Sequence, residues 1–448
     1  MAKPNIIIVT PHDLGDYLGC YGTPVPTPHI DSLARDGVLF ENHFSCGTVC
    51  SPSRGGIITG CYPHTNGLMG LVHRGWELDV AKCPPIMQLL ADDGYQTHLF
   101  GFQHEHYAPR RLGYEELHGG RAHSTHVEDV VPLLTDWLRS GQGKEMPFFV
   151  GLGFSEVHRL GMNPSGFKRD VYEPADPSDV EVRPYLPDIP QIREDLADFY
   201  GAIKFMDKMI GELLGALDET GLADKTIVVF TSDHGAAFMH SKATLYDGGT
   251  KVPWIIRWPS GLPAARRIKG LSSHVDITPT LLDLVGIPIP AWMQGRSMAQ
   301  VARGVGGAAR ELVFAEKNYT NYYDPSRMVR SHKLKYIRKG LQTCIFDFII
   351  PEIELSTSDF RRTQQVWDHY SARRCTEELY DLERDPGELK NLADDPVYAQ
   401  ALGQMRQALD AHLDSTNDPF KDLRNDLPMH PTAYEELGAM RRGRGAGH

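Results

Sequence analysis

Four short apolar segments, each followed within four residues by histidine or aspartate, constrain the fold of this chain most. They are rich in β-branched and aromatic residues, which is typical of strands buried on both faces of a parallel sheet. The segments are residues 5–10, 95–100, 147–154 and 226–231. The polar residues that follow them are His12 and Asp13, His104, His158, and Asp233 and His234. Because ligands bind at the carboxyl ends of strands in doubly wound sheets, we expect the chemistry of the protein at these positions.

Amphipathic segments separate these strands. The spacing of apolar residues predicts a long helix over 195–220, where Ile203, Met206 and Ile210 share one face. Other helices are expected at residues 27–34, 85–93, 127–140 and 276–285, and other strands at 38–40 and 253–258. This alternation predicts an α/β fold in which a large, mostly parallel sheet has helices on both faces.

The sequence pattern changes near residue 310. Strands of a small antiparallel sheet are expected at residues 312–315 and 333–337, a strand entering a turn at 378–386, and a closing helix at 396–413. We therefore expect two domains, 1–310 and 311–448, of which the second is smaller. The Gly- and Arg-rich residues 441–448 are expected to be disordered. The proline-rich segment 160–192 is expected to form a loop over the site.

Composition excludes several classes of function. The formal net charge of −12 over 448 residues argues against a general binder of nucleic acid or of anionic membranes, although a local cationic pocket could still hold an anionic substrate. The seven cysteines form no CxxC pair, so neither a disulfide framework nor a zinc ribbon is predicted. There is no run of about 18 apolar residues to span a membrane, and no secretory leader precedes the first strand. We therefore expect a cytoplasmic bacterial enzyme.

The most distinctive motif is Cys50-Ser51-Pro52-Ser53-Arg54, which continues to Thr59-Gly60. It follows a Gly- and Ser-rich loop, and a helix is expected to begin near Arg54 with its N-terminal amides facing an anion. On the residues alone, Cys50 can also be a buried thiol before a proline turn.

This motif resembles the signature of the type I sulfatases, and motifs from Asn5 to residues 391–393 occur in the order found in that family. The resemblance implies an alkaline phosphatase-like fold. It also implies that a formylglycine-generating enzyme oxidises Cys50 during maturation, and that the hydrated aldehyde supplies the attacking oxygen. Two short stretches, residues 154–159 and 416–420, look nearest to heparan N-sulfatase, the sulfamidase branch of the family.

The resemblance also implies roles for side chains around the nucleophile. Arg54 binds the nucleophile and the metal-site carboxylates, and Lys242, which precedes residues 246–249 (Tyr-Asp-Gly-Gly), holds a sulfuryl oxygen. His158 protonates the leaving group, a role that suits the pKa of imidazole, and His104 removes the proton that allows sulfate release. On the residues alone, each histidine can instead be a structural residue after a strand, and Lys242 a solvated lysine.

One divalent metal ion is expected beside Cys50. Carboxylates and imidazoles are suitable ligands for such an ion, together with the oxygen of the oxidised cysteine. The candidate ligands are Asp13, Asp233, His234, His12 and Cys50. The family usually has an acidic residue where this chain has His12. The resemblance therefore implies calcium, whereas the additional imidazole favours manganese, and magnesium is a further alternative.

A second difference from the family lies at Phe102. Relatives have a lysine two residues before the histidine that matches His104, so one cation of the sulfate pocket is missing here. Either the pocket binds a less charged group, or another residue such as His106 substitutes for the lysine.

The primary hypothesis is a sulfatase that hydrolyses the sulfate ester or sulfamate of a small aryl, alkyl or sugar substrate. One alternative is a phosphonate monoester or phosphodiester hydrolase, because loss of the lysine suits a monoanionic diester. Another is a non-catalytic protein that binds sulfated glycans. Neither a nucleic-acid nor a membrane partner is expected, and a homo-oligomer is left open.

Overall fold

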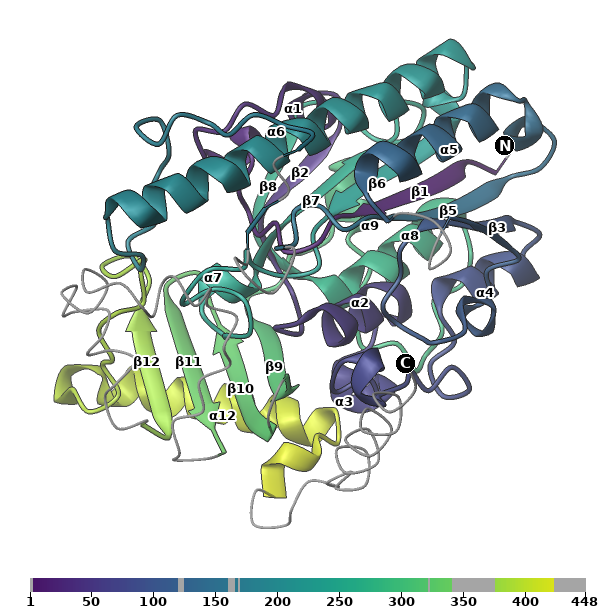
Figure 1. Ribbon diagram of the computed structural model, residues 1–448. Coiled ribbons are helices and arrows are strands. Elements are labelled where there is room, and N and C mark those ends of the chain that lie inside the picture. Colours follow the sequence, from purple (N-terminus) through teal and green to yellow (C-terminus); the bar gives the residue numbers. More distant parts are fainter. Residues whose placement is uncertain are drawn as a thin grey trace, which may run out of the picture.

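The computed structural model describes residues 3–119, 125–159, 166–167, 170–320, 323–340 and 375–422. In this part of the chain, an eight-stranded sheet covered by helices lies beside a four-stranded sheet (Figure 1). The predicted α/β class and the separate antiparallel sheet are confirmed. The segment 441–448 lies outside the described residues, and the domain boundary at residue 310 stays a prediction. Among the described residues, no helix has the length and apolar composition needed to cross a membrane.

In the large sheet, the four predicted strands that precede the candidate site residues lie next to one another. In sheet order, its strands are β4 (Glu116–His118), β3 (Gln96–Gly101), β5 (Phe148–Gly153), β1 (Asn5–Thr10), β6 (Thr226–Thr231), β7 (Lys251–Arg257), β2 (Val38–Phe44) and β8 (Arg266–Ser273). β7 is antiparallel to both of its neighbours, and every other neighbouring pair is parallel. β3, β5, β1 and β6 therefore end at the same edge, where a ligand site is expected.

Alternate residues of β1 pack against opposite layers of helices. Ile7 and Val9 are buried in a cluster with residues of α1 (Pro28–Arg35), α5 (Val127–Arg139) and α6 (Pro190–Glu219). Ile6 and Ile8 are buried in a second cluster with residues of α2 (Cys50–Thr59), α4 (Ile86–Asp92), α8 (Ile277–Val285) and α9 (Ala299–Arg303). Because both faces of the strand are covered, the four central residues of β1, Ile6 to Val9, are all apolar and do not alternate with polar residues.

The small sheet is antiparallel and packs against one long helix (Figure 1). In sheet order, its strands are β12 (Glu377–Asp381), β11 (Leu334–Lys339), β10 (Tyr323–Arg330) and β9 (Val313–Tyr319). Leu409 and Leu413 of α12 (Ala399–Ser415) share a buried cluster with Val329 and Tyr336 of the sheet. The sequence pattern did not predict β10, nor the edge strand β8 of the large sheet.

The small sheet also contacts two segments of the large domain. The backbone N of Glu316 in β9 donates to the carbonyl O of Cys46, 3.0 Å away. The hydroxyl of Tyr246, in the loop between β6 and β7, donates to Oε2 of Glu378, 3.0 Å away. The small sheet therefore supports the segment before α2 and the loop after β6, both of which carry predicted site residues.

Two predicted helix starts are wrong. α6 begins at Pro190 and not near residue 195, and α2 begins at Cys50 and not near Arg54. Pro52 lies in the first turn of the helix, where proline is tolerated. Gly56 is required by close packing, since a Cβ at this position would lie 2.2 Å from Sγ of Cys46. Tertiary packing therefore extends the helix through residues of low helix propensity.

Candidate active site

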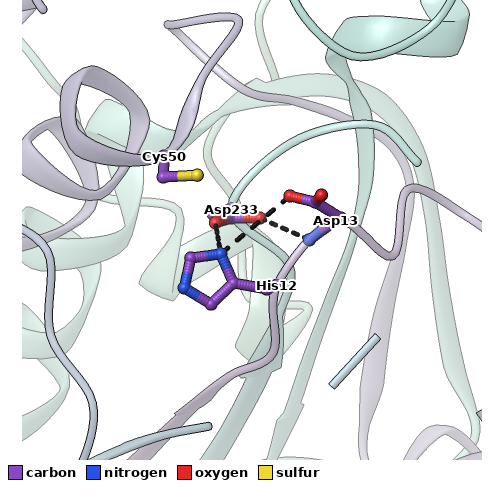
Figure 2. A group of neighbouring side chains, drawn as sticks. All are labelled: His12, Asp13, Cys50 and Asp233. Atoms are coloured by element: carbon purple, nitrogen blue, oxygen red, sulfur yellow. Dashed lines mark hydrogen bonds and ion pairs between the residues drawn. The ribbon is translucent and has the colours of Figure 1, made fainter. Parts of the chain in front are cut away.

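Cys50 is the first residue of α2, and its sulfur faces the end of the sheet (Figure 2). The residue is 4% exposed, and Sγ lies 3.3 Å from Nε2 of His234. Burial raises the pKa of the Cys50 thiol well above its ordinary value. The unmodified thiol is therefore protonated at neutral pH and is a poor nucleophile.

Two fully buried carboxylates, Asp13 after β1 and Asp233 after β6, lie beside Cys50 (Figure 2). The backbone N of Asp13 donates to Oδ1 of Asp233 at 2.9 Å. Asp13 has a left-handed backbone conformation with φ of 53°, which turns the chain sharply at the end of β1. One potential ligand atom from each of His12, Asp13, Cys50 and Asp233 lies within 4.8 Å of the others.

Two imidazoles complete this group. Nδ1 of His12 lies 3.0 Å from Oδ2 of Asp233, and burial and the charge of Arg54 lower the pKa of His12 to about 4. Nδ1 of His234 donates to the carbonyl O of its neighbour Gly235 at 2.9 Å. Nε2 of His234 therefore faces the site, 3.3 Å from Oδ1 of Asp13.

Arg54 and Lys242 place two positive charges against the carboxylates. Nε of Arg54 donates to Oδ2 of Asp233 at 3.2 Å, and Nζ of Lys242 donates to both oxygens of Asp13 at 2.9 and 2.7 Å. Burial alone would raise the pKa of Asp13, but Lys242, His158 and His234 outweigh it and lower the pKa to about 2. Asp13 is therefore ionised at neutral pH.

His158 and His104 lie around this group. Nδ1 of His158 bonds to the carbonyl O of Arg159 at 2.6 Å, and Nε2 lies 3.3 Å from Nζ of Lys242. Asp13 raises the pKa of His158, but Lys242 and burial outweigh this effect and lower it. The ring of His104 is further out, with its centroid 6.4 Å from that of His12. The structure thus brings the predicted residues of all four strands to one place.

Phe102, which stands where the resemblance implies a lysine, forms an apolar wall of the site. Its ring centroid lies 4.6 Å from that of His12, and the guanidinium carbon of Arg54 lies 5.7 Å from the centroid. His106 does not replace the missing cation through Nδ1, because this nitrogen accepts from the backbone N of Ala108 at 2.9 Å.

Two residues near the site were missed in the sequence. Nδ1 of His274 hydrogen-bonds to Oγ of Ser53 at 3.0 Å, and Ser53 in turn donates to the carbonyl O of Asp233. His274 follows β8, so recognising this strand could have identified it. Nδ1 of His73 lies 3.1 Å from Nε2 of His104. His73 follows no strand, so the pattern contained no signal for it.

The donor set fits one divalent metal ion. Two ionised carboxylates and the neighbouring imidazoles are suitable ligands, and an oxygen at position 50 would add another. Nδ1 of His12 is buried and makes no hydrogen bond within the described part of the chain. A nitrogen that faces a carboxylate without a hydrogen bond is expected where both atoms bind the same cation.

Comparisons with known proteins agree on the family. The family model described as sulfatase matches residues 4–287, more than half of the chain. A second one, described as N-sulphoglucosamine sulphohydrolase, C-terminal, matches residues 234–343.

Two curated relatives align with nearly the whole of this chain. An ulvan-active sulfatase of Formosa agariphila is 29% identical over 95% of this chain and 78% of its own length. The N-sulphoglucosamine sulphohydrolase of Homo sapiens is 29% identical over 94% of this chain and 92% of its own length. Among solved structures, the phosphonate monoester hydrolase of Agrobacterium radiobacter is similar with a TM-score of 0.72, at 20% identity, over 92% of this chain and 96% of that chain.

Proposed function

The chain belongs to the sulfatase family, and we propose that it removes sulfate from small sulfated sugars, as a sulfate ester or as a sulfamate. The names of both curated relatives support a sulfatase, and that of the human relative supports an N-sulfated glucosamine as a substrate. We further propose that a formylglycine-generating enzyme converts Cys50 to formylglycine, and that the bound ion is calcium, with manganese and magnesium as alternatives.

The observation that carries this proposal is the position of Cys50 among ionised carboxylates, imidazoles and two cations. Hydrated formylglycine would supply an oxygen nucleophile at this position, and a divalent ion held by Asp13, Asp233 and the neighbouring imidazoles would stabilise charge on the sulfuryl oxygens. Arg54 holds Asp233 in its orientation through the bond from Nε. The ammonium of Lys242 provides a point charge for a sulfuryl oxygen.

His158 is suited to protonate the leaving group. When the bond to sulfur breaks, the departing oxygen or nitrogen needs a proton. Because Nδ1 of His158 is bonded to the carbonyl O of Arg159, Nε2 is the nitrogen that faces the leaving group, and it delivers the proton from the doubly protonated ring, which returns to neutral imidazole. Nε2 lies 3.3 Å from Nζ of Lys242, so the proton donor is adjacent to the cation proposed to bind the sulfuryl group.

The test is to measure hydrolysis of sulfated substrates by protein in which the conversion of Cys50 to formylglycine has been verified. The chain is produced together with a formylglycine-generating enzyme, and mass spectrometry of the peptide around residue 50 confirms the aldehyde. N-sulfated glucosamine, 6-O-sulfated glucosamine, an aryl sulfate and an aryl phosphonate ester are then compared by kcat/KM, with Cys50→Ala as the control.

We expect sulfate release from a sulfated sugar and none from Cys50→Ala. Preferential hydrolysis of the phosphonate ester would favour the phosphonate hydrolase alternative. Aldehyde-containing protein that binds sulfated glycans without releasing sulfate would favour a non-catalytic binder.

A further inference from the structure

His73 reaches His104 from a separate part of the chain. Nδ1 of His73 lies within hydrogen-bond distance of Nε2 of His104, at 3.1 Å, and the two rings are stacked with centroids 5.3 Å apart. Nε2 of His104 is therefore occupied by this contact, and Nδ1 is the remaining ring nitrogen.

The turn that carries His73 is held in place, although His73 itself is exposed. It is a 3₁₀ turn over Val72–Arg74, closed by Gly75 with φ of 93°. Val72 is buried, and its backbone N donates to Oγ of Ser51 at 3.2 Å. Ser51 directly follows Cys50, so the turn is tied to the helix that carries the nucleophile.

The other ring nitrogen of His104 is Nδ1. Nδ1 is buried and makes no hydrogen bond to any residue that the structure describes. A neutral imidazole carries one proton, either on Nδ1 or on Nε2. The partner on Nε2 decides which nitrogen holds this proton, because neutral imidazole has one donor and one acceptor.

We propose that His73 is a positioning residue that fixes the tautomer and ring orientation of His104, so that His104 acts on the reacting group through Nδ1. The proposal rests on the proposed sulfatase function, in which His104 exchanges a proton during turnover. It adds a residue from outside the four strand ends to the active site.

Steady-state kinetics of three variants test whether His73 contributes to turnover through His104. His73→Ala removes the contact with His104, whereas His73→Asn keeps a polar atom at the position of Nδ1. His332→Ala, which removes an exposed histidine from the turn between β10 and β11, is the matched control. We expect kcat to fall roughly 10- to 100-fold in His73→Ala, the loss typical for an outer partner of a site histidine. KM should change little, His73→Asn should recover most of kcat, and His332→Ala should match the wild type.

A measurement without turnover separates this proposal from the proposed function. Long-range ¹H–¹⁵N spectra of protein labelled with ¹⁵N-histidine report the tautomer of each ring, and His104→Ala assigns the signal of His104. We expect one tautomer of His104 in the wild type and a changed pattern in His73→Ala. An unchanged pattern, or a kcat of His73→Ala within about twofold of the wild type, would overturn the role of His73. If the aldehyde-containing wild type releases no sulfate, the sulfatase function fails, and the spectra alone decide whether His73 sets the tautomer.

Discussion

Lys242 and Asp13 form a bidentate ion pair across 229 residues of sequence, with Nζ 2.9 and 2.7 Å from the two carboxylate oxygens. Asp13 is fully buried, and the side chain of Lys242 is 8% exposed. The loop after β6 therefore reaches back to the end of β1, and the charge of each side chain is compensated by the other.

Replacement of Lys242 by methionine should reduce kcat/KM by about 10²- to 10³-fold, because the site loses a donor for the sulfuryl group. In metal-free protein, the free energy of unfolding should also fall by roughly 3–5 kcal/mol, since the carboxylate of Asp13 is left uncompensated. Steady-state kinetics and urea unfolding measure both effects. Lys251→Met is the matched control, because Lys251 pairs with Asp16 instead. Equal losses in both variants would contradict the assigned role of Lys242.

Divalent metal ions should stabilise the folded protein. An ion that binds the folded state at 100 times its Kd adds about 2.7 kcal/mol to the free energy of unfolding. Thermal unfolding of chelator-treated protein with added Ca²⁺, Mn²⁺ or Mg²⁺ measures the gain and ranks the ions. The double variant Asp13→Asn, Asp233→Asn should lose this response, and a variant that responds like the wild type would place the ion elsewhere.

Unmodified Cys50 should resist alkylation in the native protein. Burial raises the pKa of its thiol, so little thiolate is present at pH 8, and the residue is only 4% exposed. Cys375 is exposed and serves as the internal control. Peptide mapping after iodoacetamide treatment should find Cys375 modified and Cys50 intact until denaturant is added. Equal rates of modification at the two cysteines would argue against the buried position of Cys50.

His64 should make stability depend on pH above neutrality. Nδ1 of His64 lies 2.5 Å from Oε2 of Glu316 and 3.4 Å from Oδ2 of Asp418. Burial alone would lower the pKa of His64, but the two carboxylates outweigh it and raise the pKa. The pair therefore stabilises the fold fully below the unfolded pKa of about 6.5, and this contribution is lost as pH rises through the higher folded pKa.

The comparison of wild type with His64→Gln isolates this effect. The difference between their free energies of unfolding should be largest near pH 6 and should shrink as pH rises toward 9. Each unit by which folding raises the pKa corresponds to about 1.4 kcal/mol. Urea unfolding at several pH values measures the difference, and a constant value across this range would rule out a charged His64 in the folded state.

The strands of the site were predictable because their local signal is strong. Residues 5–10 and 226–231 are short β-branched runs that end in polar residues, and β1 and β6 have these same bounds. The meeting of Asp13 and Asp233 then follows from parallel pairing, since strands that run in the same direction end at the same edge. The resemblance to a known family added the roles of Cys50 and Lys242, which the pattern alone did not assign.

Other features depend on contacts between distant segments. β8 contains exposed and charged residues at the edge of the sheet, so it lacks the apolar run of a central strand. Gly56 of α2 packs closely against Cys46, a contact that no local propensity indicates. The position of His73 depends on a hydrogen bond from the backbone N of Val72 to Oγ of Ser51. A contact of this kind produces no periodic pattern in the sequence.

The burial of Cys50 limits when a maturation enzyme can reach it. The segment just before α2 is bonded to the backbone of three residues made much later, since Ala243 donates to Thr48, Ser45 donates to Thr250, and Glu316 donates to Cys46. Until these three residues have been synthesised and have left the ribosome, the segment before α2 cannot form the hydrogen bonds that hold it in its buried position. If Cys50 is oxidised as proposed, the oxidation takes place before the chain has folded. Protein that finishes folding with an unmodified thiol then stays inactive, even when the formylglycine-generating enzyme is supplied afterwards.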